Sequence, residues 1–563
     1  MSASVVKRGA DRLLSEDRVA ALLVVALCAV LCLAIALPLW AVLSKSFLDA
    51  DGRFIGLANY IRYVTTPALV QSLLNSLFVA AVATILVIPL AFLYAYALTR
   101  SRIPLKGLFY ALALLPIFAP SLLPALSFIY IFGNQGFLKE LLFGASIYGP
   151  IGIVLSQVFY CLPHATMILV AALGLADGRL YEAAKSLGTP SWRIFSTITL
   201  PGALYGLVSA TVVVFTLVIT DFGIAKVIGG QFNVLATDAY KQVVGQQNFG
   251  MGAVVGMVLL TPAVIAFVID RRLRRRQVAL LSARAVPYVP QRERRRDALL
   301  LFFCSVVGGL VAAVLGVAIW ASFIRYWPYN LSLTLANYDF TTFDPDGWQP
   351  YVNSLRMAAL TALVGTPVVF LGAYLTEKSA AAPLGQAALR FLAMLPMAVP
   401  GMVLGLSYVF FFNATWNPAA VLYGTIAILA LNCLAHFYTV AHITAVTALK
   451  QIDGEFEAVA ASLQVPFWVT LRRVTVPICL PAILDIAVYL FVNAMTTVSA
   501  VIFLYGPGTK LAAISIVHMD EAGAIAAAAA MATCIVVTAI GVKILHLLLD
   551  AMLFRRLQRW RTR

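Results

Sequence analysis

The sequence predicts an all-α membrane protein with twelve transmembrane helices, arranged as two parallel repeats of six. The first observation is composition: 62% of the 563 residues are hydrophobic and only 11% are charged, whereas about a quarter of a soluble domain is charged. The second is a series of long apolar runs, and the third is an internal repeat. At ~20 apolar residues per crossing, twelve crossings need roughly 240 residues, which leaves room for long loops.

The apolar runs fall into two sets of six. They lie at about 19–43, 71–99, 107–133, 149–175, 204–228 and 250–269, and then at 298–323, 354–376, 389–413, 419–447, 478–505 and 522–549. Several runs contain proline, which membrane helices tolerate where neighbouring groups satisfy the freed backbone. The two sets predict a first six-span half over 1–270, a basic linker over 271–297 and a second six-span half over 298–563.

The distribution of Lys and Arg predicts the orientation in the membrane. The formal net charge is +16, but thirty of the 40 Lys and Arg fall in the termini and loops of one side and only seven on the other. Because basic loops stay in the cytoplasm, both termini and the linker are expected there. The linker holds ten Arg and is expected to touch anionic lipid headgroups. The excess charge is therefore a property of the topology and does not indicate nucleic-acid binding.

An internal repeat relates the two halves. Residues 177–201 (DGRLYEAAKSLGTPSWRIFSTITLP) and 453–477 (DGEFEAVAASLQVPFWVTLRRVTVP) share nine identities in 25 positions without a gap. The tripeptide Asn-Ser-Leu at 75–77 recurs at 353–355. Each copy spans six helices, an even number, so both halves are expected to insert in the same orientation. Parallel repeats of this kind place a substrate pathway between the halves.

A charged segment between the fourth and fifth runs carries the most specific motif. Glu182, Ala183 and Ala184 are predicted to lie in a short helix that Gly188 ends, and Ile-Thr-Leu-Pro201 leads into the next span. A short helix outside the membrane on a transport protein is expected to be a docking element. An ordinary cytoplasmic loop is the alternative, but the pattern recurs at the matching place in the second half.

The pattern Glu-Ala-Ala…Gly…Ile-x-Leu-Pro resembles the ATPase-coupling loop in the permease subunits of binding-protein-dependent ABC importers of the type I fold. The second copy departs from the pattern: Ala458 takes the Glu position and Gln464 the Gly position, while Glu457 lies one residue early. Ala460 and Pro477 are kept. The resemblance covers essentially the whole chain and implies that one chain forms the whole pore.

The resemblance also implies a translocation subunit of the bacterial inner membrane that is not an enzyme. The chain contains no P-loop sequence GxxxxGK[ST], so ATP and Mg are expected on two separate cytoplasmic ATP-binding subunits, one under each coupling loop. No cofactor or metal is expected on this chain. A periplasmic or lipid-anchored solute-binding protein would deliver the solute on the other face. A twelve-span secondary transporter is an alternative, but it would leave both coupling-loop patterns unexplained.

Two fused halves resemble the branch of these importers that carries ferric iron, thiamine and 2-aminoethylphosphonate. Within the branch, the stretches 142–159, 220–256 and 280–290 look closest to 2-aminoethylphosphonate permeases, so this phosphonate is the expected solute. Ferric iron or another small solute such as thiamine is the alternative, and Asp-Phe-Gly at 221–223 resembles the ferric class. A phosphonate would favour Arg or Lys ligands, yet the spans offer almost none.

Polar residues late in the fifth and eleventh spans are the candidate substrate path, because ionisable groups within a membrane are functional candidates by default. The alternative for the aspartate among them is a structural pair with Lys226, five residues on. Asp485 in the eleventh span is a second ionisable candidate. The predicted path residues are Thr220, Asp221, Asn493, Thr496 and Thr497.

Overall fold

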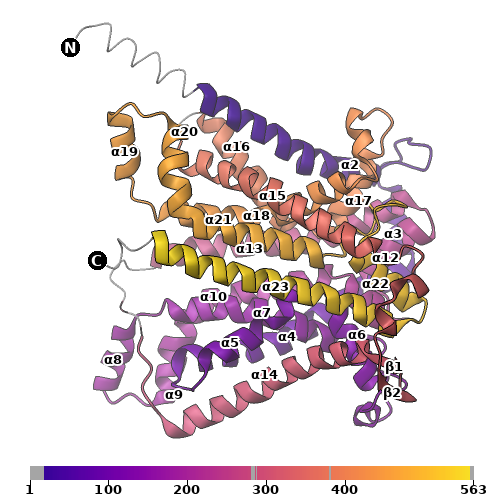
Figure 1. Cartoon of the computed structure of the whole chain (residues 1–563), viewed down its shortest axis with the longest axis horizontal. Helices are drawn as coiled ribbons and strands as arrows, with labels where there is room; N and C mark the ends of the chain where they lie inside the picture. The colour runs from indigo at the N-terminus through magenta and orange to yellow at the C-terminus, as the bar shows by residue number, and fades with distance from the viewer. Residues whose placement is uncertain (1–17, 281–285, 287, 380–381, 558–563) are drawn as a thin grey trace. The chain divides into compact units, whose positions relative to one another are not determined.

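The computed structural model describes residues 18–280, 286, 288–379 and 382–557 (Figure 1). Among these residues, ten helices are long and apolar enough to cross a membrane, and two bent helix pairs raise the number to twelve if each pair is one span. The predicted all-α membrane class is therefore confirmed.

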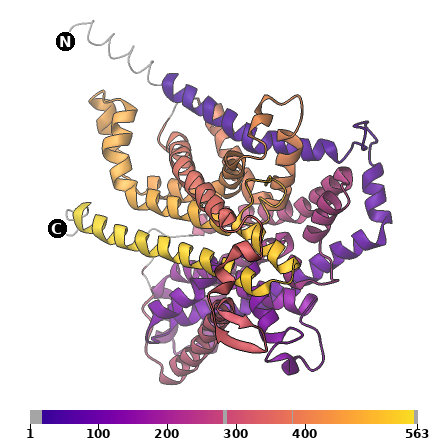
Figure 2. The ribbon, with the colours of Figure 1, turned by 45° about the vertical axis from the view of Figure 1, so that its right-hand side comes forward.

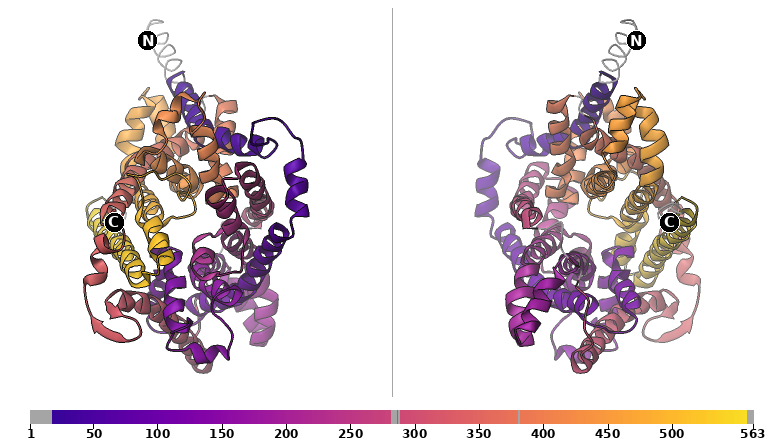
Figure 3. Two further views of the ribbon diagram at one scale, coloured as in Figure 1. Left: turned by 90° about the vertical axis from the view of Figure 1, so that its right-hand side faces the viewer. Right: turned by 90° about the vertical axis from the view of Figure 1, so that its left-hand side faces the viewer.

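Two compact units make up the described residues, and they do not follow chain order. The α4 unit holds 46–348 and 513–536, and the α15 unit holds 18–45, 349–512 and 537–557. The first span thus packs with helices of the second half, and the seventh span with helices of the first. Several long helices of each unit are seen end-on in Figure 3. The predicted division into 1–270, 271–297 and 298–563 concerns the sequence repeat, not these units, and stays a prediction.

The α4 unit is built mainly from the first half of the sequence. The ring of Phe303, on the seventh span, lies 6.3 Å from that of Tyr94 on the second span. A short antiparallel hairpin follows the seventh span (Figure 2). The elements are α3 (Ala58–Thr65), α4 (Pro67–Arg100), α5 (Lys106–Leu114), α6 (Leu122–Phe132), α7 (Pro150–Gly174), α8 (Gly178–Ser186), α9 (Ser191–Ile194), α10 (Leu200–Thr220), α11 (Gly223–Ile228), α12 (Leu235–Tyr240), α13 (Phe249–Leu280), α14 (Arg294–Ser322), β1 (Ile324–Tyr326), β2 (Asn330–Leu333) and most of α22 (Ala512–Glu521).

The α15 unit is built mainly from the second half. The Tyr408 hydroxyl donates a hydrogen bond to the backbone oxygen of Ala34 at 2.7 Å, which ties the first span, Arg18–Lys45, to this unit. The elements are α2 (Leu37–Lys45), α15 (Gln349–Glu377), α16 (Pro383–Met394), α17 (Gly401–Phe412), α18 (Ile426–Lys450), α19 (Glu455–Ser462), α20 (Phe467–Thr470), α21 (Val476–Thr496) and most of α23 (Ile525–Leu557).

Prolines break the third and ninth spans. Lys106–Phe118 and Leu122–Phe132 form a pair bent by 101°, and Pro383–Ala398 and Gly401–Phe412 a pair bent by 114°. Pro120 and Pro400 lie at the breaks, because proline lacks the backbone N–H that would continue the helix and clashes with the preceding turn. The apolar runs predicted at 107–133 and 389–413 are therefore each a pair of helices joined at a sharp bend.

The predicted repeat is kept in the secondary structure. α10 and α21 both have 21 residues, and α7 and α18 both have 25. A π-helical turn precedes α10 at Phe195–Thr199 and α21 at Leu471–Thr475. The gapless register of 177–201 and 453–477 thus applies to the elements that these residues form.

Candidate functional site

α8 is a short helix with well-defined ends. The Asp177 carboxylate accepts the backbone N–H of Arg179 at 3.1 Å, which satisfies an otherwise free amide of the first turn. Gly188 has a φ of +67°, the left-handed conformation that ends many helices and that glycine adopts without a Cβ clash. Pro190 then caps α9. The predicted short helix and its glycine stop are both present.

One face of α8 packs against the protein. Tyr181 and Ala184 are buried and form a small apolar cluster with Ile194 of α9. The Tyr181 hydroxyl donates a hydrogen bond to Oγ1 of Thr199 at 3.0 Å. Because Thr199 ends the π-helical turn before α10, α8 is attached directly to the base of the fifth span.

The opposite face of α8 is exposed. Glu182 and Ala183 face outward. Two large apolar side chains nearby are also exposed, Leu187 by 83% and Trp192 by 75%. α8 therefore has both an attached face and an exposed face that can receive a partner.

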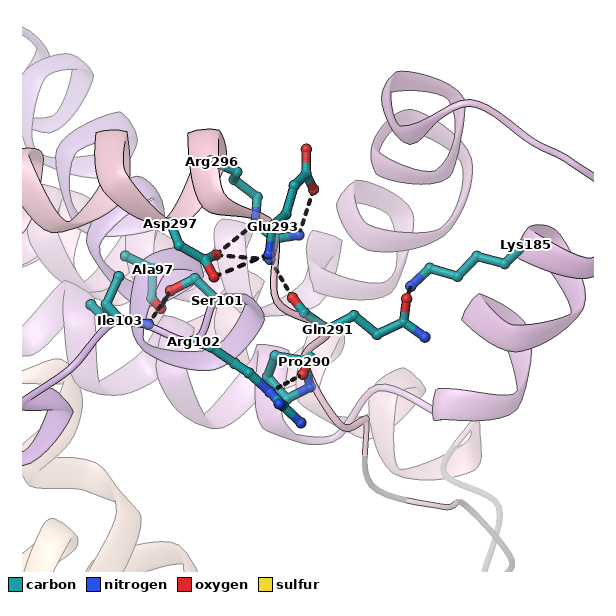
Figure 4. Close-up of polar contacts among 10 residues, drawn as sticks. All are labelled: Ala97, Ser101, Arg102, Ile103, Lys185, Pro290, Gln291, Glu293, Arg296 and Asp297. Atoms are coloured by element: carbon teal, nitrogen blue, oxygen red, sulfur yellow. Dashed lines mark hydrogen bonds and ion pairs between the residues drawn. The ribbon is translucent and has the colours of Figure 1, made fainter.

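The described part of the linker contacts α8 (Figure 4). The backbone N–H of Gly178 donates to the oxygen of Val286 at 2.8 Å. The ammonium group of Lys185 donates to Oε1 of Gln291 at 2.7 Å. The sequence did not predict this contact, and linker residues 281–285 and 287 lie outside the described part of the chain.

α19 occupies the matching place in the second half. The Asp453 carboxylate accepts the backbone N–H of Glu455 at 3.1 Å, as Asp177 does in the first half. Gln464 stands in the place of Gly188 and has a φ of +54°. Pro466 then caps α20. The chain therefore follows the same path although the glycine is missing.

The two helices present different residues outward. Ala458 is exposed in the place of Glu182, and Ala460 is half-buried. Glu457 forms an ion pair with Lys378 at 2.9 Å, and only 25% of its side chain is exposed. The Glu457 carboxylate thus points toward the end of α15. At the position that Glu182 has in α8, the exposed face of α19 carries an alanine and no acid.

The prolines of the two motifs have equivalent places. Pro201 and Pro477 are the second residues of α10 and α21, and both are exposed. Proline is tolerated in the first turn of a helix because the amide it lacks has no partner within the helix. Both prolines lie in the first turn of a span, α10 or α21, and not on the short helices α8 and α19.

A cavity of about 680 Å³ lies beside α19. Phe456 and Val459 of the helix and Val469 of α20 provide apolar lining, and Asp453 and Glu455 provide carboxylates. A hollow with an apolar floor and a few charged groups can receive a side chain of a docking partner. The exposed face of α19 therefore adjoins a hollow that could receive part of a partner.

Asp221 lies at the end of α10 and is held by hydrogen bonds from three directions. Its carboxylate accepts the backbone N–H of Ile224 at 2.9 Å and the side-chain amide of Gln157 on α7 at 3.1 Å. Ser121, at the break in the third span, also hydrogen-bonds to it. Asp221 therefore braces the third, fourth and fifth spans against one another.

Lys226, the expected alternative partner of Asp221, has other partners. Its ammonium group lies 2.5 Å from the carboxylate of Glu521 on α22 and 4.9 Å from the ring centroid of Tyr240. Lys226 thus does not form the structural pair with Asp221. It forms an ion pair with Glu521, which belongs to the other half of the sequence. Sequence reasoning missed it because no local spacing links Lys226 to Glu521.

The other candidate path residues are half-buried. The hydroxyls of Thr220 and Thr496 and the amide of Asn493 each donate to a backbone oxygen one turn earlier, at 2.8, 3.0 and 2.8 Å. Such bonds are a common way for polar side chains to be satisfied within a helix. Thr220 and Asp221 belong to the α4 unit, and Asn493, Thr496 and Thr497 belong to the α15 unit.

Comparison with known proteins places this geometry in a family. FbpB 1 of Haemophilus influenzae, a protein named as a candidate ferric transport system permease, is 29% identical over 496 residues, which are 84% of this chain and 76% of that protein. The ferric transport permease FbpB of Actinobacillus pleuropneumoniae is 28% identical over 505 residues, 86% of this chain and 72% of its own. The molybdenum permease ModB of Escherichia coli is 32% identical over 157 residues, 27% of this chain and 69% of its own.

A solved bacterial ABC transporter involved in the import of the acidic polysaccharide alginate is 16% identical, with a TM-score of 0.34, over 43% of this chain and 88% of that one.

Residues 87–278 and 368–555 match the family described as binding-protein-dependent transport system inner membrane component. The two matches fall in the two sequence halves and together cover more than half of the chain. This membership excludes the secondary-transporter alternative and implies ATP-hydrolysing and solute-binding partners. The relatives named above give the prediction of a 2-aminoethylphosphonate permease no support. The chain therefore belongs to the binding-protein-dependent inner membrane components, the multi-pass, non-catalytic permeases of ABC importers.

Proposed function

We propose that this permease carries ferric iron into the cytoplasm, and that α8 and α19 are the docking elements for two ATP-binding subunits. The iron assignment rests on similarity to two proteins named as ferric permeases over 84% and 86% of this chain. One observation carries the docking assignment: both helices have the same capped start, left-handed stop and following π-helical turn, and each leaves one face exposed.

Charge in the spans also favours a cation over a phosphonate as the solute. A phosphonate dianion is best bound by free Arg or Lys groups. Three basic residues lie in or at the predicted spans, Lys226, Arg356 and Lys543, and two of them already have carboxylate partners. Lys226 lies 2.5 Å from Glu521, and Lys543 lies 3.9 Å from Asp485 on α21. Recruiting either lysine for a phosphonate would break its existing ion pair.

The proposed cycle is a shift between two populations. ATP binding closes the ATPase dimer and displaces α8 and α19. The helix bundles then rock from an inward-facing to an outward-facing state while the loaded solute-binding protein is docked. ATP hydrolysis resets the assembly with the solute released inside.

Calorimetry on the cognate solute-binding protein tests the solute. We expect tight binding of ferric ion and no heat from 2-aminoethylphosphonate. Uptake of the same ligand by vesicles that contain the permease, the ATP-binding subunits and the solute-binding protein then ties that ligand to this chain. Tight binding of the phosphonate alone would overturn the iron assignment and leave the permease architecture unchanged.

A further inference from the structure

A basic residue ends the second span of each sequence half. Arg100 is the last residue of α4, and Lys378 directly follows α15. Each lies four residues beyond the tyrosine of a matching Ala-Tyr pair, at 95–96 and 373–374. The two cations therefore occupy the same position of the repeat.

Arg100 joins three elements of the α4 unit. The residue is only 3% exposed. Its guanidinium carbon lies 5.3 Å from the ring centroid of Tyr181 on α8 and 4.8 Å from that of Tyr288 in the linker, both within the range of cation–π attraction. It also donates a hydrogen bond to the backbone oxygen of Leu173, at the end of the fourth span, at 2.6 Å.

Lys378 makes the corresponding contacts in the α15 unit. Its ammonium group lies 2.9 Å from the carboxylate of Glu457 on α19, and only 11% of its side chain is exposed. It also donates to the backbone oxygen of Ile452 at 3.2 Å, just beyond the end of the tenth span. A cation thus connects a short external helix to the ends of two spans here as well.

The partners on the two short helices are equivalent too. Tyr181 and Glu457 are both the fifth residue of the matched segments 177–201 and 453–477. The first half therefore uses a cation over aromatic rings and the second half uses an ion pair to make the same connection. Different chemistry at one position of a repeat indicates that the connection is required there, and it gives Glu457 a role other than contact with a partner subunit.

We propose that Arg100 and Lys378 are the positioning residues that transmit movement of α8 and α19 to the membrane spans. The inference rests on the proposed docking function of these helices. Separating a buried charge from its partner leaves that charge uncompensated, so the connection stays closed while the helix moves. A displaced α8 or α19 then carries the ends of the second and fourth spans, or of the eighth and tenth, with it.

The test is the ratio of solute imported to ATP hydrolysed in vesicles that contain the complete transporter. The solute is ferric ion or 2-aminoethylphosphonate, whichever the solute-binding protein binds in calorimetry. We expect Lys378→Met to lower this ratio at least about fivefold, the lower end of typical coupling between sites, and Lys378→Arg to retain it. Glu457→Gln, which keeps the shape of the side chain and removes its charge, should lower the ratio in the same way. Arg100→Gln tests the first half.

Further variants separate a loss of coupling from a loss of folding or of docking. Lys450→Met removes a 65% exposed cation 3.7 Å from Glu377 at the same end of the unit and should leave the ratio unchanged. A merely structural role would reduce the amount of assembled transporter and leave the ratio intact, so an unchanged ratio in both Lys378→Met and Glu457→Gln overturns the proposal. Glu182→Lys, assayed in parallel, reports on docking itself, because it leaves both connections in place.

Discussion

Gly188 and Gln464 share the left-handed backbone conformation, with φ values of +67° and +54°, at the same position after α8 and α19. Glycine adopts this conformation freely, whereas a residue with a Cβ is strained there. The second half therefore keeps the same turn, although glutamine disfavours the left-handed conformation that the turn requires. The turn fixes the angle between each short helix and the span that follows it.

Replacing Gln464 with glycine should relieve this strain. We expect Gln464→Gly to raise the free energy of local opening of α19 by up to about 1 kcal/mol. Gly188→Gln should lower the free energy of local opening of α8 by about 1–2 kcal/mol. Amide hydrogen exchange of the two helices measures both effects. Gly202→Ala, at a site where an added Cβ meets nothing within 4 Å, should leave α8 unchanged. If α8 and α19 exchange at the parent's rate in all three variants, the turn is not strained.

Reversing the charge at Glu182 should uncouple the transporter. The side chain is exposed on the outward face of α8, so Glu182→Lys is expected to leave folding and insertion intact. Uptake should fall about tenfold or more while basal ATP hydrolysis continues. Glu140→Lys, at another exposed carboxylate, is the matched control and should transport normally. Normal uptake by Glu182→Lys in reconstituted vesicles would remove the docking role from α8.

The sequence could predict the class, the number of spans and the two external helices, because each leaves a local signal. Apolar runs mark the spans, and the repeated motif marks α8 and α19. The bends of 101° and 114° in the third and ninth spans were not predicted. Prolines occur in several spans, and whether a neighbour satisfies the freed backbone depends on the tertiary structure.

The contacts of the site were less predictable than its elements. Glu457 was expected near the exposed position of the motif, but its carboxylate faces Lys378. A pair of Lys226 with Asp221 was the structural alternative to a path role, but Lys226 pairs with Glu521. Both partners come from elements distant in the sequence, and periodicity reports which side of a helix is apolar without saying which residue will face it.

Asp221→Asn should impair uptake without weakening the ATPase partnership. The carboxylate accepts bonds from Ile224 and Gln157, and an amide oxygen can replace only part of this acceptor capacity, leaving a buried donor at a cost of about 1–3 kcal/mol. Transport assays alongside co-purification of the ATP-binding subunits measure the two properties separately. Thr211→Val removes a hydroxyl of α10 that bonds within its own helix and that is not among the path residues, so it should keep most of the uptake. If Asp221→Asn transports with unchanged kinetics, Asp221 is no part of the path.

Asp520 should make stability depend on pH. It lies on α22, outside the candidate spans, where burial, reinforced by Glu521 and opposed by Lys226, raises its pKa from 3.8 to about 7. As pH rises from about 4 to 7, the unfolded chain loses the proton that the folded chain keeps, so stability falls through that window. Asp520→Asn stays neutral throughout.

The Asn variant should therefore match the parent at pH 4 and unfold at a temperature about 2 °C or more higher at pH 8. Thermal unfolding of the purified protein across pH 4–8 measures the difference. Asp51→Asn, at an exposed turn, should follow the parent at every pH. A variant at Asp520 that is less stable than the parent at pH 8 would mean that the carboxylate is ionised and favourably paired in the folded protein.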